Sequence, residues 1–342
     1  MAKGTDQSAA LQQLKQAIRE QNPDNLYFFH GEETFLLHHY LEQLKKLILD
    51  ELTESFNYHR FTNENFTLQE FADAVENLPM MAERTLVHVD DVDLFRLPAD
   101  TKSKVIEILK DIPDYCTVVV TFLTVVWKSD KELTDCGQVV EFARQEPRDL
   151  IPWVTRHFAA KGKRISTDLC NYLIDITGGT MTALSGEIEK ICAYSGADHI
   201  QKSDIDAVTE PVLDAVVYQI TDMMGKGNYG GALDKLHQVM KMQEEPPKIL
   251  GMIGSHFRKI GTARTLMDNG KQTGDLMKLC GIKSSYSAQK YMDMARRFSP
   301  AFCRRASELV LETDRKMKTS FDDAERLLEV LILALAQEAR RA

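Results

Sequence analysis

The chain has 342 residues, 44% of them hydrophobic and 27% charged, and its net charge is −9. A chain of this length usually forms two or three domains. It has no run of about 20 uncharged apolar residues, so we expect no membrane span, and its start lacks the apolar core of a signal peptide, which predicts a cytoplasmic protein.

The charge is unevenly distributed: residues 1–210 carry −14 and residues 211–342 carry +5. An acidic first part argues against a broad nucleic-acid surface there, because phosphates would be repelled. The mildly basic second part permits DNA contact but does not require it.

Metal and disulfide chemistry is not indicated. The six cysteines form no CxxC pair, and the pattern favours buried free thiols. His38 and His39 are adjacent, so on a helix they point in different directions and cannot share a metal as an i, i+4 pair could. We therefore predict no metal, no cofactor and no catalytic residue.

Short apolar runs alternate with helical patterns from residue 26 to residue 141. Runs rich in Val, Phe and Leu predict buried strands, and the segments between them predict helices, so we expect a mostly parallel sheet with helices on its faces. The expected strands are 26–31, 84–89, 116–123 and 138–143, and the expected helices are 34–50, 68–77 and 101–110.

Strand patterns stop at Pro147, and the rest of the chain is predicted to be helical. Ser166 is placed to cap one helix and Gly178 to end it. The last predicted helix, 321–341, has a wide apolar stripe that needs covering within its domain or on another subunit. We expect three domains: an α/β domain at 1–146, a helical domain at 147–211 and a second helical domain at 212–342.

A phosphate-binding loop is missing from the sequence. Such a loop needs G-x-x-x-x-G-K-[ST], and none of the three Gly-Lys pairs fits this pattern. The segment after the first strand reads "HGEETFLL", and its Glu32 and Glu33 would repel phosphate.

Three acids follow the second predicted strand. Asp90 and Asp91 superficially resemble the acidic strand end that holds magnesium in ATPases, and Asp93 lies nearby. Without a phosphate loop, a solvated strand end explains the pair better, and Asp93 fits a loop.

Taken together, the segments resemble the delta subunit of the bacterial DNA polymerase III clamp loader. The resemblance covers roughly residues 26–337 in the family's order. It rests on these stretches: "LYFFHGEETFLL", "SFNYHRF", "LPMMAERTLV", "PWVTRHFAAKGKRIS", "GGTMTALSGEIEKICAYSG", "GALDKLHQVMKMQEEPPKILGMIGSHFRKI" and "ARRFSPAFCRRASELVLETDRKMKT".

This resemblance implies an AAA+-like (RecA-like) α/β domain that has lost ATP binding, a helical lid domain and a helical collar domain that packs into a five-subunit ring. The implied partners are the sliding clamp (beta subunit), the gamma/tau and delta prime subunits, and primer-template DNA. Two departures stand out: Ser284 and Ser285 replace a His-Pro frequent in the family, and Met80 and Met81 replace a Leu and a Phe.

The segment 77–84 joins a helix to a strand. Thr67 and Glu70 form a capping box, and Leu68, Phe71, Val75 and Leu78 give the helix one apolar face. Pro79 prevents the helix from continuing, so Met80 and Met81 lie in a turn.

Periodicity alone leaves two roles for the methionines, as gap-fillers in the core or as exposed contacts. The resemblance implies the second. Met80 and Met81, supported by Leu78 and Pro79, would be the wedge that enters an apolar pocket of the clamp.

Two functions of different classes follow. The first is an interaction protein that binds and opens the sliding clamp for loading onto primed DNA. The alternative is an enzyme, either a degenerate nucleotide-binding ATPase or a metal-dependent nuclease using Asp90, Asp91 and Asp93. A third interpretation is an independent DNA-binding regulator, which would require tight, salt-dependent binding to DNA by the isolated chain.

Overall fold

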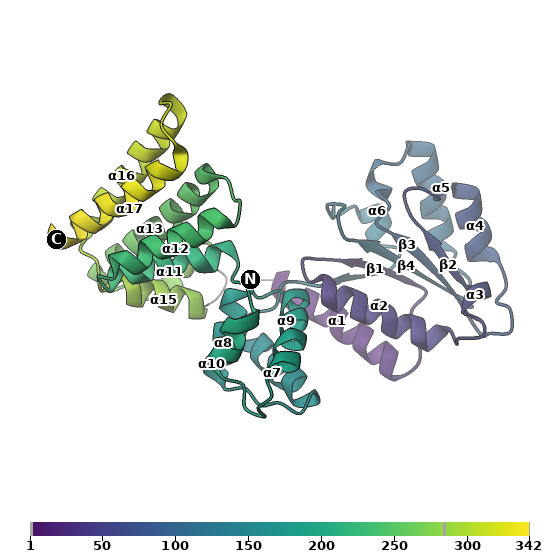
Figure 1. The fold of residues 1–342 in the computed structure, drawn as a ribbon. Helices are drawn as coiled ribbons and strands as arrows, with labels where there is room; N and C mark the ends of the chain where they lie inside the picture. Colours follow the sequence, from purple (N-terminus) through teal and green to yellow (C-terminus); the bar gives the residue numbers. More distant parts are fainter. Residues whose placement is uncertain (1–2, 283–284, 342) are drawn as a thin grey trace. The chain divides into compact units, whose positions relative to one another are not determined.

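The computed structural model describes residues 3–282 and 285–341. It divides the chain into two compact units, residues 1–144 and 145–342. The first unit is α/β, and the second is built from helices, as Figure 1 shows. The predicted fold class, an α/β domain with a parallel sheet followed by helical segments, is confirmed.

A five-stranded sheet forms the centre of the first unit. Its strands pair in the order β2-β3-β4-β1-β5, and every pair is parallel. The strands are β1 (Leu26–His30), β2 (Tyr58–Phe61), β3 (Thr85–Asp90), β4 (Cys116–Phe122) and β5 (Gln138–Glu141).

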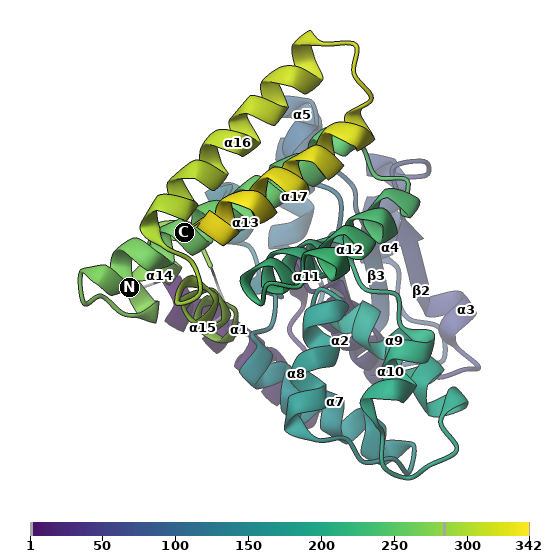
Figure 2. The same cartoon turned by 60° about the vertical axis from the view of Figure 1, so that its left-hand side comes forward.

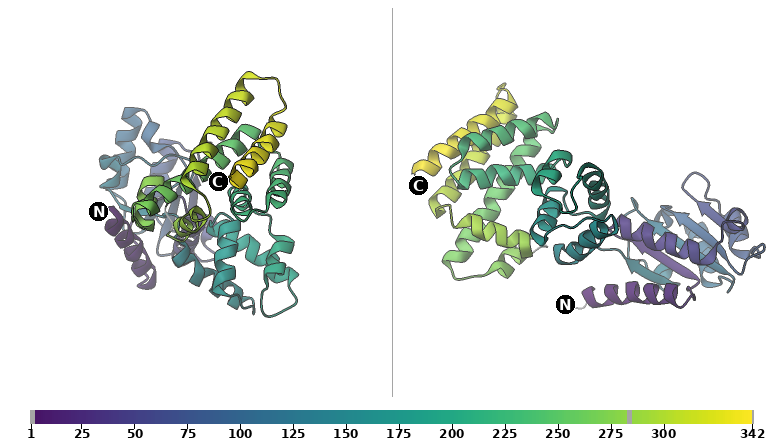
Figure 3. Two further views of the ribbon diagram at one scale, coloured as in Figure 1. Left: turned by 90° about the vertical axis from the view of Figure 1, so that its left-hand side faces the viewer. Right: turned by 60° about the horizontal axis from the view of Figure 1, so that its bottom comes forward.

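Helices cover both faces of this sheet. They are α1 (Lys3–Arg19), α2 (Thr34–Ile48), α3 (Glu54–Asn57), α4 (Leu68–Glu76), α5 (Ala99–Lys110) and α6 (Lys131–Thr134), with a 3₁₀ turn, η1, at Leu94–Arg96. Figure 3 shows α1, in purple, within this unit. Side chains alternate along each strand, so Phe28 and Val118 pack toward α4 and α5, whereas Phe29 and Val119 pack toward α1 and α2. Burial on both faces explains why these strands are continuous apolar runs.

The four predicted strands are all present, with small changes at their ends. Strand β2 was not predicted, because "YHRF" places polar His59 and Arg60 between two aromatics, and only Phe61 is fully buried. It lies at the edge of the sheet, where one side has no strand neighbour and less apolar surface is needed.

The second unit begins with four helices that pack on one another. They are α7 (Pro147–Ala160), α8 (Thr167–Ile176), α9 (Met181–Tyr194) and α10 (Lys202–Val208). The Ser166 hydroxyl accepts a hydrogen bond from the Leu169 amide, as the predicted cap requires, and Gly178 follows α8 with φ +77°. The Lys163 ammonium donates to the carbonyls of Ser195 and Ala197, at 3.0 and 2.8 Å, so the loop after α7 is tied to the end of α9.

Seven further helices share one large apolar core. They are α11 (Leu213–Gly225), α12 (Tyr229–Lys241), α13 (Pro246–Asp268), α14 (Thr273–Cys280), α15 (Ser285–Ala295), α16 (Pro300–Thr319) and α17 (Ala324–Arg341). Ser285 begins α15, and Ser284 lies outside the described residues. Figure 2 shows α16 and α17 running beside each other.

The stripe on α17 is largely covered within the unit. Leu327, Leu328, Leu331 and Leu335 are buried. Among the described side chains of the stripe, Val330 and Leu333 remain exposed, at 48% and 54%. The apolar surface left for another subunit is therefore narrower than the sequence suggested.

All six cysteines are free. Cys116, Cys170 and Cys303 are buried, and the other three are half-buried. The predicted burial of the thiols therefore holds for three of the six.

Burial affects two imidazoles in the first unit. Burial lowers the pKa of His88 to about 4, and burial likewise lowers the pKa of His30 to about 4. His88 lies between the Tyr58 hydroxyl and the Thr121 hydroxyl, each 3.0 Å from a ring nitrogen. His30 stacks on the Trp127 ring at 4.3 Å.

Acid should destabilise the first unit through these two histidines. Between pH 6.5 and about 4 the unfolded chain binds protons that the folded unit excludes, so the free energy of unfolding falls as the pH decreases. We expect a loss of about 2 kcal/mol for each histidine between pH 7 and pH 5. The two tryptophans lie one in each unit, so urea unfolding of Trp153→Phe, followed by the fluorescence of Trp127, reports on the first unit.

His88→Gln, which keeps a neutral hydrogen-bonding group, should remove about half of this pH dependence. Equal unfolding free energies at pH 7 and pH 5 would contradict the assignment.

Candidate functional site

Helix α4 leads into the segment that carries the methionines. The Thr67 hydroxyl accepts from the Glu70 amide at 3.2 Å and donates to the Glu70 carboxylate at 2.9 Å, so the two residues of the predicted capping box bond to each other. Phe71 and Val75 are buried as predicted. The helix ends at Glu76, however, and Leu78 is 73% exposed, so its placement on the buried helix face was wrong.

Met80 and Met81 are exposed at the turn between α4 and β3. The exposed fractions are 56% for Met80 and 94% for Met81, so neither side chain fills the core. Met81 also has φ +55°, a left-handed conformation that costs most residues other than glycine roughly 1–2 kcal/mol. The surrounding structure must therefore hold this turn in place.

Asn57 holds the turn. Its side chain is fully buried, its carbonyl oxygen accepts from the Met80 amide at 2.7 Å, and its amide nitrogen donates to the Met80 carbonyl at 2.9 Å. The same nitrogen donates to the Thr53 carbonyl at 3.1 Å. One side chain thus joins the end of α3 to the turn by bonding both backbone groups of Met80.

The role of Asn57 was not predicted from the sequence. Asn57 lies next to an edge strand, and its bonding partner is 23 residues away in the chain. The available signal was an asparagine before a weak strand, which equally predicts an ordinary turn.

Exposed apolar side chains gather on the two segments that Asn57 joins. We call Leu52, Phe56, Leu78, Met80 and Met81 the apolar patch. Among the described side chains of the first unit, only one other large hydrophobic, Val126, is exposed. A concentration of this kind on one part of a surface is typical of a contact with another protein.

The segment after β1, where a phosphate-binding loop would lie, packs against the residue that follows β5. Gly31 has φ +135°, and a Cβ added there would lie 2.2 Å from the Phe142 carbonyl oxygen. The Glu33 amide donates to that same oxygen at 2.9 Å, and the Glu33 side chain is buried. Backbone that would cradle a phosphate in a nucleotide-binding loop is here packed on the end of β5.

The three acids at the end of β3 and just after it have structural partners. Asp91 accepts from the amides of Leu123, Thr124 and Val125 at 2.8–3.0 Å, which holds the loop after β4. Burial raises the pKa of Asp91, but these hydrogen bonds and that of the Thr124 hydroxyl outweigh it and lower the pKa overall.

Asp90 bonds Arg60 on the edge strand and accepts from the Thr121 hydroxyl. Asp93 caps the 3₁₀ turn η1 through the Phe95 amide. The three carboxylates thus stabilise three different local structures. Among the described residues, no group of three or more His, Cys, Asp and Glu side chains could hold a metal ion.

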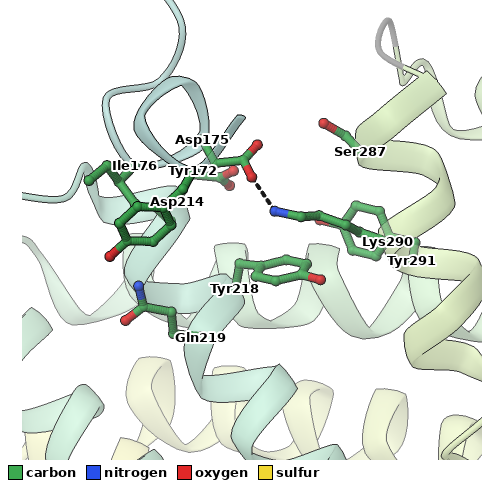
Figure 4. Close-up of a pocket in the computed structure, with 10 residues that line it drawn as sticks. Tyr172, Asp175, Ile176, Asp214, Tyr218, Gln219, Ser287, Lys290 and Tyr291 are labelled. Atoms are coloured by element: carbon green, nitrogen blue, oxygen red, sulfur yellow. Dashed lines mark hydrogen bonds and ion pairs between the residues drawn. The ribbon is translucent and has the colours of Figure 1, made fainter. Parts of the chain in front are cut away.

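A small cavity of about 180 Å³ lies in the second unit between α8, α11 and α15. Figure 4 shows Asp175 and Lys290 pointing toward each other across it, and the two form an ion pair. The Lys290 ammonium also lies 5.1 Å from the centre of the Tyr218 ring. The Lys290 ammonium, which could otherwise bind an anionic ligand, is therefore already paired with groups of the protein.

Beside this cavity, Asp214, His256 and Tyr291 form a chain of hydrogen bonds of 3.2 and 3.0 Å. The order of acid, imidazole and hydroxyl is that of a nucleophilic triad. Burial raises the pKa of the Tyr291 hydroxyl, however, and the side chain is only 5% exposed. The arrangement ties α11, α13 and α15 together and offers no accessible nucleophile.

Comparison with known proteins decides the family. A family model described as "DNA polymerase III, delta subunit" matches residues 27–136, and one described as "DNA polymerase III delta subunit, C-terminal domain" matches residues 214–335. The chain belongs to the DNA polymerase III delta subunit family. The predicted resemblance is thereby confirmed.

Relatives of this delta-family chain match over nearly their full length. The DNA polymerase III subunit delta of Bacillus subtilis is 26% identical, over 91% of this chain and 92% of the relative. A probable DNA polymerase III subunit delta of Aquifex aeolicus is 22% identical, over 89% of each.

A solved structure, the Bacillus subtilis DNA clamp loader delta protein, has the same fold, with a TM-score of 0.58 and 22% identity. The match covers 96% of this chain and 99% of that one.

Within the described residues, no helix is long and apolar enough to cross a membrane.

Replacing Asp91 tests whether the acids are structural. Asp91→Ala removes three charge-assisted hydrogen bonds to backbone amides, so we expect it to lower the free energy of unfolding of the first unit by about 2–4 kcal/mol. Asp91→Asn, which keeps one acceptor oxygen, should cost less than half as much. Urea unfolding followed at Trp127 measures both.

The metal-dependent alternative makes a different prediction. If Asp90, Asp91 and Asp93 formed a magnesium site, millimolar Mg²⁺ would raise the melting temperature of the natural chain and not that of Asp91→Ala. We expect no such difference.

Proposed function

We propose that this chain is the clamp-loader subunit that binds the sliding clamp and opens the ring for loading onto primed DNA. The wedge, Met80 and Met81, supplies the contact, with Leu78 and Pro79 supporting it. The observation that carries the proposal is the 94% exposure of Met81 in a left-handed conformation, on a turn that Asn57 holds through Met80. An exposed apolar side chain in a costly backbone conformation is better explained by a partner than by folding.

A binding role fits the chemistry of the first unit. Gly31 and Glu33 pack against the sheet where a phosphate-binding loop would lie. The acids that could bind magnesium instead form hydrogen bonds that hold nearby loops. The proposed mechanism is therefore binding energy without nucleotide chemistry: apolar side chains leave water for a pocket on the clamp, while neighbouring subunits hydrolyse ATP.

The proposed partners are the clamp (beta subunit), the gamma/tau and delta prime subunits, and primer-template DNA within the assembled loader, in the cytoplasm. Residues 147–211 would form the lid and residues 212–342 the collar. The exposed Val330 and Leu333 are the candidate collar contacts on α17.

Changing both wedge residues tests the proposal directly. Met80→Ala/Met81→Ala should weaken binding to the purified cognate clamp by about 2–4 kcal/mol, roughly 30-fold to 1,000-fold in Kd, because each side chain loses about 1–2 kcal/mol of desolvation. Stability should hardly change, because both side chains are exposed. Val126→Ala, at another exposed apolar residue of the same unit, is the matched control and should bind normally.

In the double alanine variant, placing Phe at position 81 (Met80→Ala/Met81→Phe) should recover or exceed the affinity of the natural chain. An aromatic ring buries more area and has fewer rotatable bonds to immobilise. A double alanine variant that melts early but binds the clamp normally would reject the wedge.

Assembly should depend on the other unit. Val330→Asp/Leu333→Asp places charges on the exposed edge of α17, so we expect it to reduce incorporation into the loader at least tenfold, by size-exclusion chromatography of the reconstituted complex. Its clamp binding should remain. Met81→Asp should show the reverse pattern, and loss of both properties in either variant would contradict the division of roles.

A further inference from the structure

A second exposed segment precedes β2. Leu52 is 87% exposed and Phe56 is 55% exposed. Leu52 does not project from a loose loop, because the Asp50 carboxylate accepts from the amides of Leu52 and Thr53, each at 2.9 Å. The segment is therefore a fixed turn that presents apolar side chains to solvent.

Segment 52–57 and the methionine turn are held as one body. Asn57 bonds both backbone groups of Met80 on one side. On the other side, Glu54 bonds Lys45 of α2 at 2.6 Å. The segment that carries Leu52 and Phe56 is therefore held in a fixed position relative to Met80.

The wedge alone is too small to form a stable interface. Specific protein–protein interfaces bury about 800 Å² on each partner and involve about 20–30 residues a side. Two methionines and a leucine supply only a part of such a contact. Leu52 and Phe56 are the large exposed apolar side chains of the segment that Asn57 joins to the turn.

The charges around the apolar patch select the kind of partner. Acids flank both segments in the chain: Asp50 and Glu51 on one, and Glu76 and Glu83 on the other, whereas Glu54 is paired with Lys45 and Arg84 follows Glu83. Acids at this density repel nucleic-acid phosphates and anionic lipid surfaces. They suit a protein surface with an apolar centre and basic residues around it.

We propose that the clamp-docking surface has two parts: the wedge, and an anchor formed by Leu52 and Phe56, with Asn57 as the positioning residue that fixes one part against the other. This inference rests on the proposed function. It adds that the facing surface of the clamp has a second apolar contact area and a basic rim.

Binding of the full-length variants to the purified cognate clamp tests the anchor. Leu52→Ala/Phe56→Ala should raise the Kd about 10-fold to 100-fold with no loss of stability in urea, whereas Val126→Ala should leave both unchanged. Normal binding by the Leu52/Phe56 variant, together with weak binding by the Met80/Met81 variant, would overturn the two-part surface and leave the proposed function standing. Normal binding by the Met80/Met81 variant would reject the wedge, whereas no binding of the natural chain to the clamp would overturn the proposed function itself.

A thermodynamic cycle tests the positioning role of Asn57. Asn57→Ala should weaken clamp binding in the natural chain but add little in the Met80→Ala/Met81→Ala background, because it acts through the turn. An equal effect of Asn57→Ala in both backgrounds would overturn this role.

Hydrogen exchange on the natural chain avoids any dependence on the folding of a variant. The amides of residues 51–57 and 78–82 should both gain protection when the clamp is added. Protection of residues 78–82 alone would reject the anchor. Binding should also weaken as salt is raised, and an affinity independent of salt would reject the basic rim.

Discussion

The hydrogen bonds between Asn57 and the backbone of Met80 are the interaction on which the surface of the first unit depends. A turn that exposes Leu78, Met80 and Met81 gains no stability from burying them, so it needs another source of order. Asn57 supplies it from a fully buried position, where its hydrogen bonds are protected from competing water. The conformational cost at Met81 is then met by folding, before any partner arrives, which leaves less entropy to lose on binding.

Residues at the carboxyl end of the sheet, where a nucleotide-binding loop would lie, support the sheet and its loops. Parallel strands bring their carboxyl ends to one edge, where a ligand usually binds. At this edge Gly31 approaches Phe142 too closely for any side chain, and Asp91 accepts three amides of the next loop. The glycine and the acid at these strand ends thus hold the backbone around them in place.

The sequence was sufficient to predict the sheet and most of the helices because the signals there are local. Continuous apolar runs such as 116–123, rich in β-branched residues, favour strands in a sheet covered on both faces, and Ser166 and Gly178 mark helix ends by their own chemistry. Pro79 placed Met80 and Met81 in a turn, but periodicity could not tell exposed side chains from core ones. Their exposure depends on Asn57, whose partner lies far away in the chain.

Two other features were not predicted correctly from the sequence, because each depends on backbone structure that local side-chain patterns do not show. Strand β2 forms because β3 offers it a neighbour, and "YHRF" has little strand character without that contact. The apolar spacing that placed Leu78 on the buried face of α4 continued past Glu76, although the backbone had already left the helix. The apolar spacing typical of a helix can therefore continue in the sequence beyond the residue at which the helix ends.

An exposed apolar patch is an aggregation hazard, and the fold limits this hazard by protecting the edges of the sheet. The edge strand β2 is short, and its Arg60 pairs with Asp90, which discourages another strand from adding there. The opposite edge, β5, is contacted by α1. The apolar side chains therefore stand on a turn and a one-turn helix, which offer no backbone ladder to extend, and acids precede and follow them in the chain. A protein with a matching pocket can bind such a surface, while a second copy would bring acid against acid.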